Sequence, residues 1–154
     1  MGKVITGIKA GVVSGAILGI VLASFIYLSL ILFKEEFMFM ISLLSDSQIG
    51  AEQLYDIMLL MGPILYFIIG IILGLIVGAI YGRAYDKIPG RTSIIKGIII
   101  GIILWLILPV LLGLGVILPY SYYAYGLGVD LITYLIFGVL LGYFYNRFTP
   151  KAVG

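Results

Sequence analysis

The sequence predicts an all-α, polytopic membrane protein with four transmembrane helices arranged as two hairpins. The first observation is composition: the 154 residues are 63% hydrophobic and 10% charged, whereas soluble domains are about 45–50% apolar and about 25% charged. The second is that long uncharged stretches separate the charged residues, and a membrane-spanning helix needs about 20 apolar residues. This length suits one bundle without a separate soluble domain, so residues 1–154 are expected to form a single domain.

The uncharged intervals set the predicted spans. The helices are predicted at residues 4–33, 57–82, 94–118 and 127–147, with an outer loop at 34–56 and a cytoplasmic loop at 83–93. Pro119 and the tyrosine-rich segment after it end the third helix, because proline removes a backbone donor. The last uncharged run, 131–146, is slightly short for the hydrocarbon core at about 1.5 Å per residue, so the fourth helix is placed to begin before it.

The outer loop is expected to contain a short helix that lies on the membrane surface. Its apolar residues follow the helical spacing i, i+3, i+4 and i+7: Phe37, Met40, Ile41 and Leu44. Ser45 and Gln48 match a capping box weakly, which predicts an extension of the second span. In the cytoplasmic loop, Thr92 or Ser93 can cap the third span.

Charged residues sort onto the two sides of the membrane. One side holds both termini and the 83–93 loop, with Asp86 as its acid and the bases Lys3, Lys9, Arg83, Lys87, Arg91, Lys96, Arg147 and Lys151. The other side holds Lys34 and the acids Glu35, Glu36, Asp46, Glu52, Asp56 and Asp130. By the positive-inside rule, both termini are cytoplasmic in a multi-pass protein of the cell membrane. Several cytoplasmic bases are expected to contact anionic lipid headgroups: Arg83, Lys87, Arg91, Lys96 and Arg147.

Glycines recur every four residues on each predicted span, in the pattern of a glycine zipper. The expected packing residues are Gly7, Gly11, Gly15, Gly19, Gly70, Gly74, Gly78, Gly97, Gly101, Gly138 and Gly142. An i, i+4 row stays on one helix face, and the missing Cβ lets two backbones approach closely. The rows lie in the cytoplasmic half, whereas bulky side chains with Pro63 and Pro109 lie in the outer half. We therefore expect a bundle that is tight inside and splayed outside.

The two hairpins suggest a parallel internal repeat. The second span ends with Gly74, Gly78, Tyr81 and Arg83, and the fourth ends with Gly138, Gly142, Tyr145 and Arg147 at the same spacing. Glycine rows and interfacial Tyr and Arg are also common in unrelated membrane helices, so duplication and coincidence both remain open. A true repeat of two-span units implies a pseudo-two-fold axis along the membrane normal.

The outer half is where a ligand pocket is expected, because splayed helices leave a gap that lipid or a small amphiphile must fill. The candidate lining residues carry hydroxyl groups, with one carboxylate at the mouth: Ser24, Tyr27, Tyr66, Thr133, Tyr134 and Asp130. The competing interpretation is that these tyrosines make interfacial or interhelical hydrogen bonds. Periodicity cannot say which side chains face inward, because apolar residues surround every span.

The absence of His and Cys from the sequence excludes disulfides, thiolate chemistry and the common zinc and haem sites. We therefore expect a non-enzymatic membrane protein without a cofactor, resembling small glycine-rich four-span proteins of prokaryotes as a class. The main hypothesis is a structural or accessory subunit of a larger membrane assembly. The alternatives are a small oligomeric transporter or channel, and an outer-leaflet lipid-binding or amphiphile-binding protein. Expected partners are membrane lipids and other membrane subunits or further copies of the chain, and no nucleic acid.

Overall fold

The computed structural model describes residues 2–44, 50–112 and 120–150. The elements are α1 (Gly2–Leu32), α2 (Lys34–Leu44), α3 (Ala51–Ala84), α4 (Ser93–Trp105), the π-helix η1 (Leu106–Leu112) and α5 (Tyr120–Phe148). Four helical segments are long and apolar enough to cross a membrane: Gly2–Leu32, Ala51–Ala84, Ser93–Leu111 and Tyr125–Phe148. Because the described residues contain helices and no strand, the predicted all-α class with four spans is confirmed.

Two helices, α3 and α5, begin well before their predicted first residues. α3 begins at Ala51 and not at residue 57, because Glu52 and Asp56 are exposed and a helix can continue beyond the apolar core. Gly50 is its N-cap and provides no side-chain hydrogen bond, while Ser45 and Gln48 lie outside the described residues. α5 begins at Tyr120 and not at residue 127, so the tyrosine-rich segment is helical. The predicted end of the third span, at residue 118, also lies outside the described residues.

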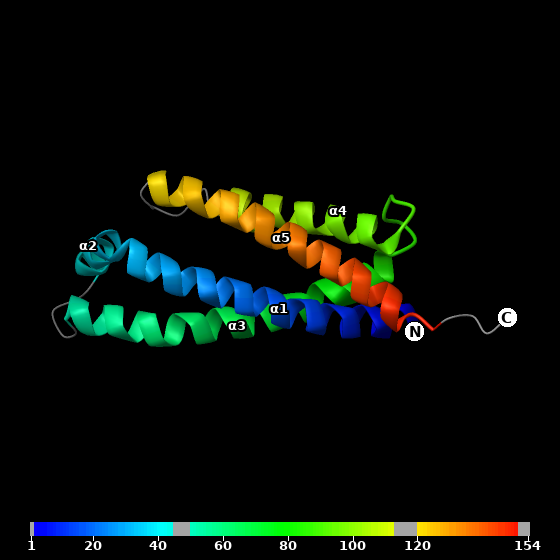
Figure 1. Ribbon diagram of the computed structural model, residues 1–154, viewed down its shortest axis with the longest axis horizontal. Helices are drawn as coiled ribbons and strands as arrows, with labels where there is room; N and C mark the ends of the chain where they lie inside the picture. Colours follow the sequence, from blue (N-terminus) through cyan, green and yellow to red (C-terminus); the bar gives the residue numbers. More distant parts are fainter. Residues whose placement is uncertain (1, 45–49, 113–119, 151–154) are drawn as a thin grey trace.

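The short helix α2 was expected at residues 37–44 and occupies Lys34–Leu44. It turns back across the end of the bundle that is farther from the termini (Figure 1), which we call the α2 end. Phe37 and Ile41 are buried in a cluster with Leu30 and Tyr55. The Tyr55 hydroxyl donates a hydrogen bond of 2.8 Å to the Leu30 carbonyl, so α3, α1 and α2 are held together there.

The helices α1 and α3 pack with their glycine rows in direct backbone contact. A Cβ atom built on Gly15 would lie 2.6 Å from the Gly70 carbonyl oxygen and 2.7 Å from the Gly74 Cα. The same closeness repeats along the pair, joining Gly7 to Gly78 and Gly82, Gly11 to Gly74 and Gly78, and Gly19 to Phe67 and Gly70. Any larger residue would force these backbones apart, so glycine sets the distance between the two helices.

The helices α4 and α5 form the second hairpin with the same type of contact. Gly97 meets Gly138 and Gly142, and Gly101 meets Tyr134 and Gly138. In α1, Gly11 meets Gly74 and Gly78 in the corresponding way, and Gly15 meets Gly70 and Gly74. The register therefore matches the sequence repeat, which favours duplication. The packing between hairpins is not symmetric, because α1 packs on α5 while α3 and α4 form no comparable interface among the described residues.

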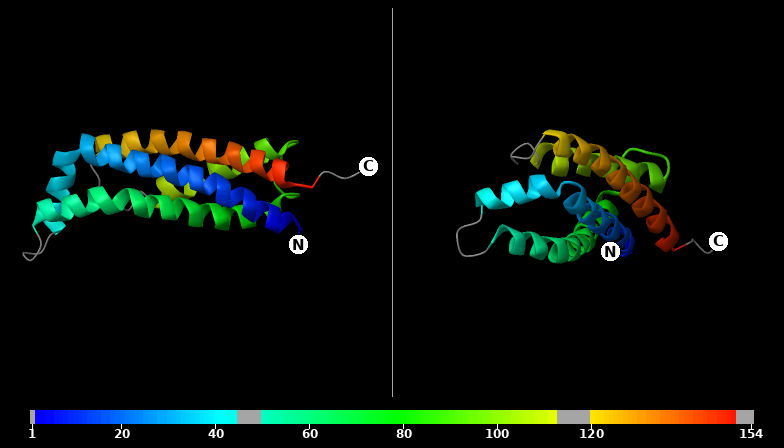
Figure 2. Two further views of the ribbon diagram at one scale, coloured as in Figure 1. Left: turned by 60° about the horizontal axis from the view of Figure 1, so that its bottom comes forward. Right: turned by 60° about the vertical axis from the view of Figure 1, so that its left-hand side comes forward.

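The two hairpins converge at the end that holds the termini, which we call the terminus end, and diverge toward the α2 end (Figures 1 and 2). At the terminus end, Tyr81 of α3 is fully buried and its ring meets Tyr145 of α5 edge-on, 5.1 Å between centroids. Tyr85 stacks on Tyr145 with centroids 4.5 Å apart. The Tyr81 hydroxyl donates a hydrogen bond of 2.6 Å to the Ser93 carbonyl at the start of α4. These three rings join both hairpins at one point, and we call them the tyrosine cluster.

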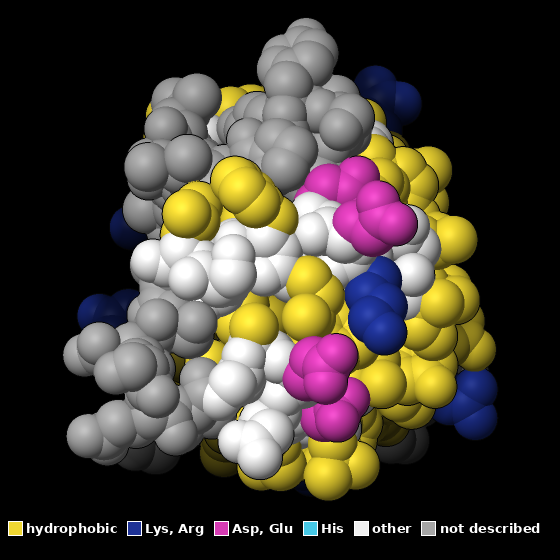
Figure 3. Space-filling view, turned by 90° about the vertical axis from the view of Figure 1, so that its left-hand side faces the viewer, with side chains coloured by type: hydrophobic (Ala, Val, Ile, Leu, Met, Phe, Trp, Pro, Cys, Tyr) yellow, Lys and Arg dark blue, Asp and Glu magenta, His cyan; other side chains and the backbone are white. Residues whose placement is uncertain are grey.

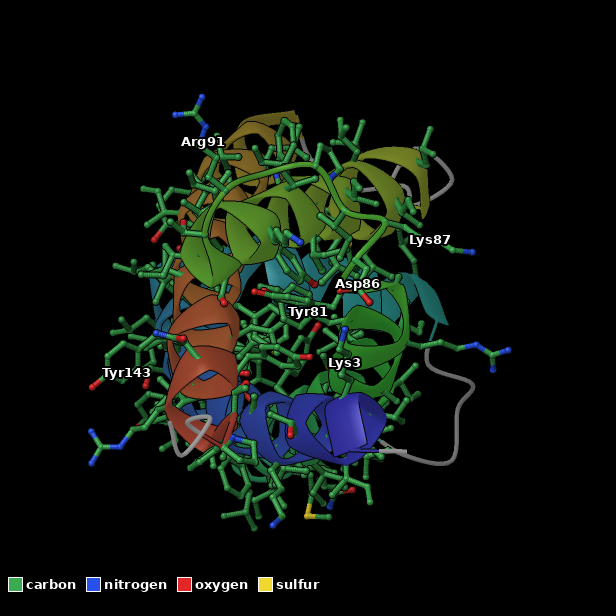
Figure 4. All side chains as sticks on the ribbon, turned by 90° about the vertical axis from the view of Figure 1, so that its right-hand side faces the viewer. Lys3, Tyr81, Asp86, Lys87, Arg91 and Tyr143 are labelled. Atoms are coloured by element: carbon green, nitrogen blue, oxygen red, sulfur yellow. The ribbon has the colours of Figure 1, made fainter. Side chains whose placement is uncertain are left out.

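Charge separates between the two ends as the sequence predicts. Acidic side chains lie on the α2 end (Figure 3), whereas Lys3, Asp86, Lys87 and Arg91 lie at the terminus end (Figure 4). The Lys3 ammonium donates hydrogen bonds of 2.9 and 2.7 Å to the Asp86 carboxylate oxygens. These bonds lower the pKa of Asp86 below its ordinary value. The pair connects the start of α1 to the turn that follows α3.

Candidate functional site

A cavity of about 430 Å³ lies between the two hairpins, in the half of the bundle nearer the α2 end. All four spans contribute to its walls, mostly with apolar side chains such as Leu22, Ile26, Ile69 and Leu73. Its volume falls within the range of about 300–1,000 Å³ that is typical of small-molecule sites. An apolar cavity with a few polar groups is suited to an amphiphilic molecule.

Three polar groups of the cavity come from α3 and α5. Tyr66 projects from α3, and Asp130 and Tyr134 project from α5. The Asp130 carboxylate interacts electrostatically with both tyrosine hydroxyls. Within the described part of the chain, none of these three side chains forms a hydrogen bond or an ion pair with another residue. They therefore offer one carboxyl group and two hydroxyl groups to whatever occupies the cavity.

The wall formed by α4 is shaped by Pro109 and held by Trp105. Pro109 lines the cavity within η1, where the helix widens from α to π geometry. Proline provides no backbone donor, and π segments are frequent at functional sites. The Trp105 indole donates a hydrogen bond of 3.0 Å to the Leu127 carbonyl, and Leu127 also lines the cavity. This bond fixes the α4 wall against α5.

The structure brings together part of the predicted pocket. Tyr66, Asp130 and Tyr134 line the cavity. Thr133 is buried, but its hydroxyl donates to the Val129 carbonyl one turn earlier at 2.8 Å, and it does not line the cavity.

Ser24 and Tyr27 do not line this cavity with Tyr66. They line a separate open groove of about 640 Å³, together with Pro63 and Phe67. The physical reason is helix rotation: Leu22, Ile26 and Ser29 share the face of α1 toward the cavity, whereas Ser24 and Tyr27 lie on another face.

The sequence prediction missed most of the cavity lining, including Ser29, Tyr125 and Gly126. Tyr125 lies in the segment that was predicted as a loop. Gly126, Asp130 and Tyr134 are spaced i, i+4 and i+8 on α5, so they share one helix face. This spacing could have identified Gly126, once Asp130 was taken as the centre of a site. A Cβ atom on Gly126 would meet no atom within 4 Å, so the glycine leaves open space in the cavity.

The predicted lipid-contacting bases are mostly exposed at the terminus end. Arg83, Lys87, Arg91 and Arg147 are exposed, and Figure 4 shows Lys87 and Arg91 pointing away from the bundle. Lys96 differs, because its ammonium donates a hydrogen bond of 2.6 Å to the Tyr85 carbonyl. The same ammonium lies 4.1 Å from the centre of the Tyr85 ring. Lys96 therefore supports the tyrosine cluster, and this contact separates it from the other bases that were expected to face lipid.

Comparison with known proteins identifies a family for this chain but assigns it no activity. No curated protein and no solved structure matches the chain. One family model, described as "Family of unknown function (DUF6789)", matches residues 1–153. Since the match covers nearly the whole sequence, the chain belongs to this family of unknown function.

Proposed function

We propose that this protein is a non-enzymatic integral membrane protein that binds an amphiphile from the surrounding leaflet in the cavity between its hairpins. The observation that carries the proposal is the unpartnered set of Tyr66, Asp130 and Tyr134 in a mostly apolar cavity of about 430 Å³. Ionisable residues inside membrane segments are costly, and they commonly mark a functional site. Apolar walls suit an alkyl chain, while the three polar groups suit a head group.

The glycine contacts favour this function over that of an accessory subunit. An accessory subunit that binds its partners through glycine-rich helix faces must expose those faces on its surface. Here the rows of α1 and α3 meet each other, and so do those of α4 and α5. The convergence of the hairpins at the tyrosine cluster also argues against a channel through the chain, because the cavity lies on one side of that cluster.

Trp105 provides a direct test, since it is the single tryptophan of the chain and bonds to a cavity residue. Bromine atoms quench tryptophan fluorescence on contact. We expect brominated dodecanol to quench Trp105 with a saturable concentration dependence when the purified protein is held in dodecyl maltoside micelles. Saturation is the sign of a discrete site, whereas general partitioning into the micelle rises without a plateau.

Two matched glycine variants identify where the probe binds. Gly126→Leu places a side chain into the cavity without a backbone clash, and we expect it to abolish the saturable quenching. Gly128→Leu, two residues further along α5, adds the same side chain at an exposed position that does not line the cavity. This control should behave as the unaltered protein. Equal quenching in both variants, or no saturation in any of them, would refute the proposed function.

A further inference from the structure

We propose that the bound amphiphile carries a cationic nitrogen head group and that Asp130 is the group that recognises it. This inference rests on the proposed function, because it assigns the ligand class of the same cavity. Among the described residues that line the cavity, Asp130 is the single acidic or basic residue. It therefore decides which charge the site selects.

The chain itself supplies no counter-ion for Asp130 within its described part. Lys34 is the base on the α2 side of the molecule, and its ammonium lies 5.2 Å from the centre of the Tyr55 ring. The salt bridge of the described residues joins Lys3 to Asp86 at the opposite end. A carboxyl group in apolar surroundings either takes up a proton or pairs with a cation, because an unpaired charge is costly there. A cation from outside the chain would stabilise the charged form of Asp130, which the described residues leave without a counter-ion.

The surroundings of Asp130 suit an organic cation better than a metal ion. Calcium takes about six to eight oxygen ligands, and magnesium is held by carboxylates in an octahedral arrangement with water. Asp130 offers one carboxylate, and its polar neighbours in the cavity include Tyr66, Tyr125 and Tyr134. Aromatic faces attract ammonium and quaternary ammonium groups through cation–π interactions. The apolar walls formed by Leu22, Ile69 and other residues then accommodate the alkyl chain.

The matching register of the two hairpins pairs this carboxylate with a phenol. The sequence offset that relates Gly74 to Gly138 also relates Tyr66 to Asp130. Both members of this second pair line the cavity, one from each hairpin. One repeat thus contributes a phenol where the other contributes a carboxylate. Within the described cavity lining, a carboxyl group therefore comes from the second hairpin and not from the first. Helix packing does not require this difference, whereas a site that selects a cationic ligand does.

The test compares two brominated probes that differ in head group, dodecyltrimethylammonium and dodecanol, by quenching of Trp105 in dodecyl maltoside micelles. We expect the unaltered protein to bind the cationic probe more tightly than the alcohol. Asp130→Asn should weaken binding of the cationic probe by about tenfold to a hundredfold, the size expected for a lost charge-assisted contact. Binding of the alcohol should not change, because the cavity keeps its shape.

Asp56→Asn is the matched control for general attraction of cations to the acidic end. Asp56 is exposed on α3 and does not line the cavity. Its replacement by asparagine therefore removes one carboxylate, as Asp130→Asn does, but leaves the cavity unchanged. We expect this variant to keep the preference for the cationic probe. Equal loss of preference in both variants would overturn the inference, since it would assign the preference to surface charge. Retained preference in Asp130→Asn would overturn it as well.

The two proposals fail in different ways. If both probes bind the unaltered protein equally and Gly126→Leu blocks both, the cavity binds amphiphiles but does not select a cation. If neither probe shows saturable quenching, the proposed function itself fails. Phosphatidylcholine with brominated acyl chains carries the same trimethylammonium group and identifies the source of the ligand. Binding that depends on Asp130 supports a membrane lipid, whereas binding of the cationic dodecyl probe alone supports a free cationic amphiphile.

Discussion

Glycine determines how closely the two helices of each hairpin pack in this protein. Gly15 and Gly74 show the effect, because a Cβ on either residue would press into the backbone of the other helix. The i, i+4 spacing of the glycines predicts which residues share a face. The partner of each glycine could not be predicted, because the sequence does not state the register between helices. Sequence reasoning thus identifies the contact surface, and the structure supplies the pairing.

Gly74→Ala should destabilise the first hairpin, because its Cβ would lie 2.5 Å from the Gly15 Cα. Overpacking of this kind typically costs about 1–3 kcal/mol. Gly62→Ala is the control on the same helix, since its Cβ would meet the nearest side-chain atom at 3.8 Å, an ordinary contact. Thermal unfolding in detergent should show a lower midpoint for Gly74→Ala alone. Equal midpoints for the two variants would contradict the role assigned to the glycine rows.

Tyr81→Phe should weaken the junction between the hairpins, because it removes the hydroxyl that donates to the Ser93 carbonyl. Loss of such a bond typically costs about 0.5–1.5 kcal/mol. Tyr143→Phe removes a hydroxyl from an exposed tyrosine of α5, where it accepts a hydrogen bond of 3.2 Å from Arg147. Chemical denaturation in mixed micelles should therefore show a larger decrease in unfolding free energy for Tyr81→Phe. A larger decrease for Tyr143→Phe would show that the tyrosine cluster does not stabilise the bundle.

At the scale of elements, uncharged intervals locate the spans but not their ends. Charged residues mark where the hydrocarbon core ends. The backbone hydrogen bonds of a helix can continue beyond that point into water, and α3 therefore starts before Asp56. The tyrosine-rich segment of α5 was predicted as an exit from the membrane and is helical, because its sequence contains no proline after Pro119 to stop a helix. The cap of α4 could be predicted, since threonine before an apolar run is a local signal.

Thr92→Ala should destabilise the start of α4, because the Thr92 hydroxyl accepts a hydrogen bond of 3.3 Å from the Ile95 backbone N–H. Loss of an N-cap typically costs about 1 kcal/mol. Thr92→Ser keeps the hydroxyl and should retain most of the stability. Hydrogen exchange of the first-turn amides of α4 should be faster in Thr92→Ala than in Thr92→Ser. Identical exchange rates would show that the cap contributes nothing measurable.

At the scale of the whole molecule, the positions of small and large residues predict where the bundle opens. Glycine rows lie toward the terminus end, and the cavity lies nearer the α2 end, between bulky residues and Pro109. The sequence could not predict that Tyr27 faces away from this cavity while Tyr66 and Tyr134 line it, because all three lie in helices that are apolar on every side. Helix rotation depends on the packing of neighbouring helices, which is a property of the assembled bundle.

The separation of charge between the two ends predicts the orientation in the membrane. We expect a single cysteine at Lys87 to be labelled from the cytoplasmic side, and one at Glu36 from the opposite side, since both residues are exposed at opposite ends. The chain has no cysteine of its own, so each variant reports one site. Labelling of sealed right-side-out and inside-out vesicles with an impermeant reagent measures the orientation. Labelling of both sites from one side would contradict the four-span topology.

The most direct test of the central claim is native mass spectrometry of the protein purified in mild detergent from its own membrane. We expect a non-protein mass bound to the unaltered chain and to Gly128→Leu, and its loss from Gly126→Leu, whose new side chain enters the cavity. The bound molecule, once released and fragmented, should contain an alkyl chain and a cationic nitrogen. The same bound mass on both variants, or a bare chain in all three proteins, would contradict the account.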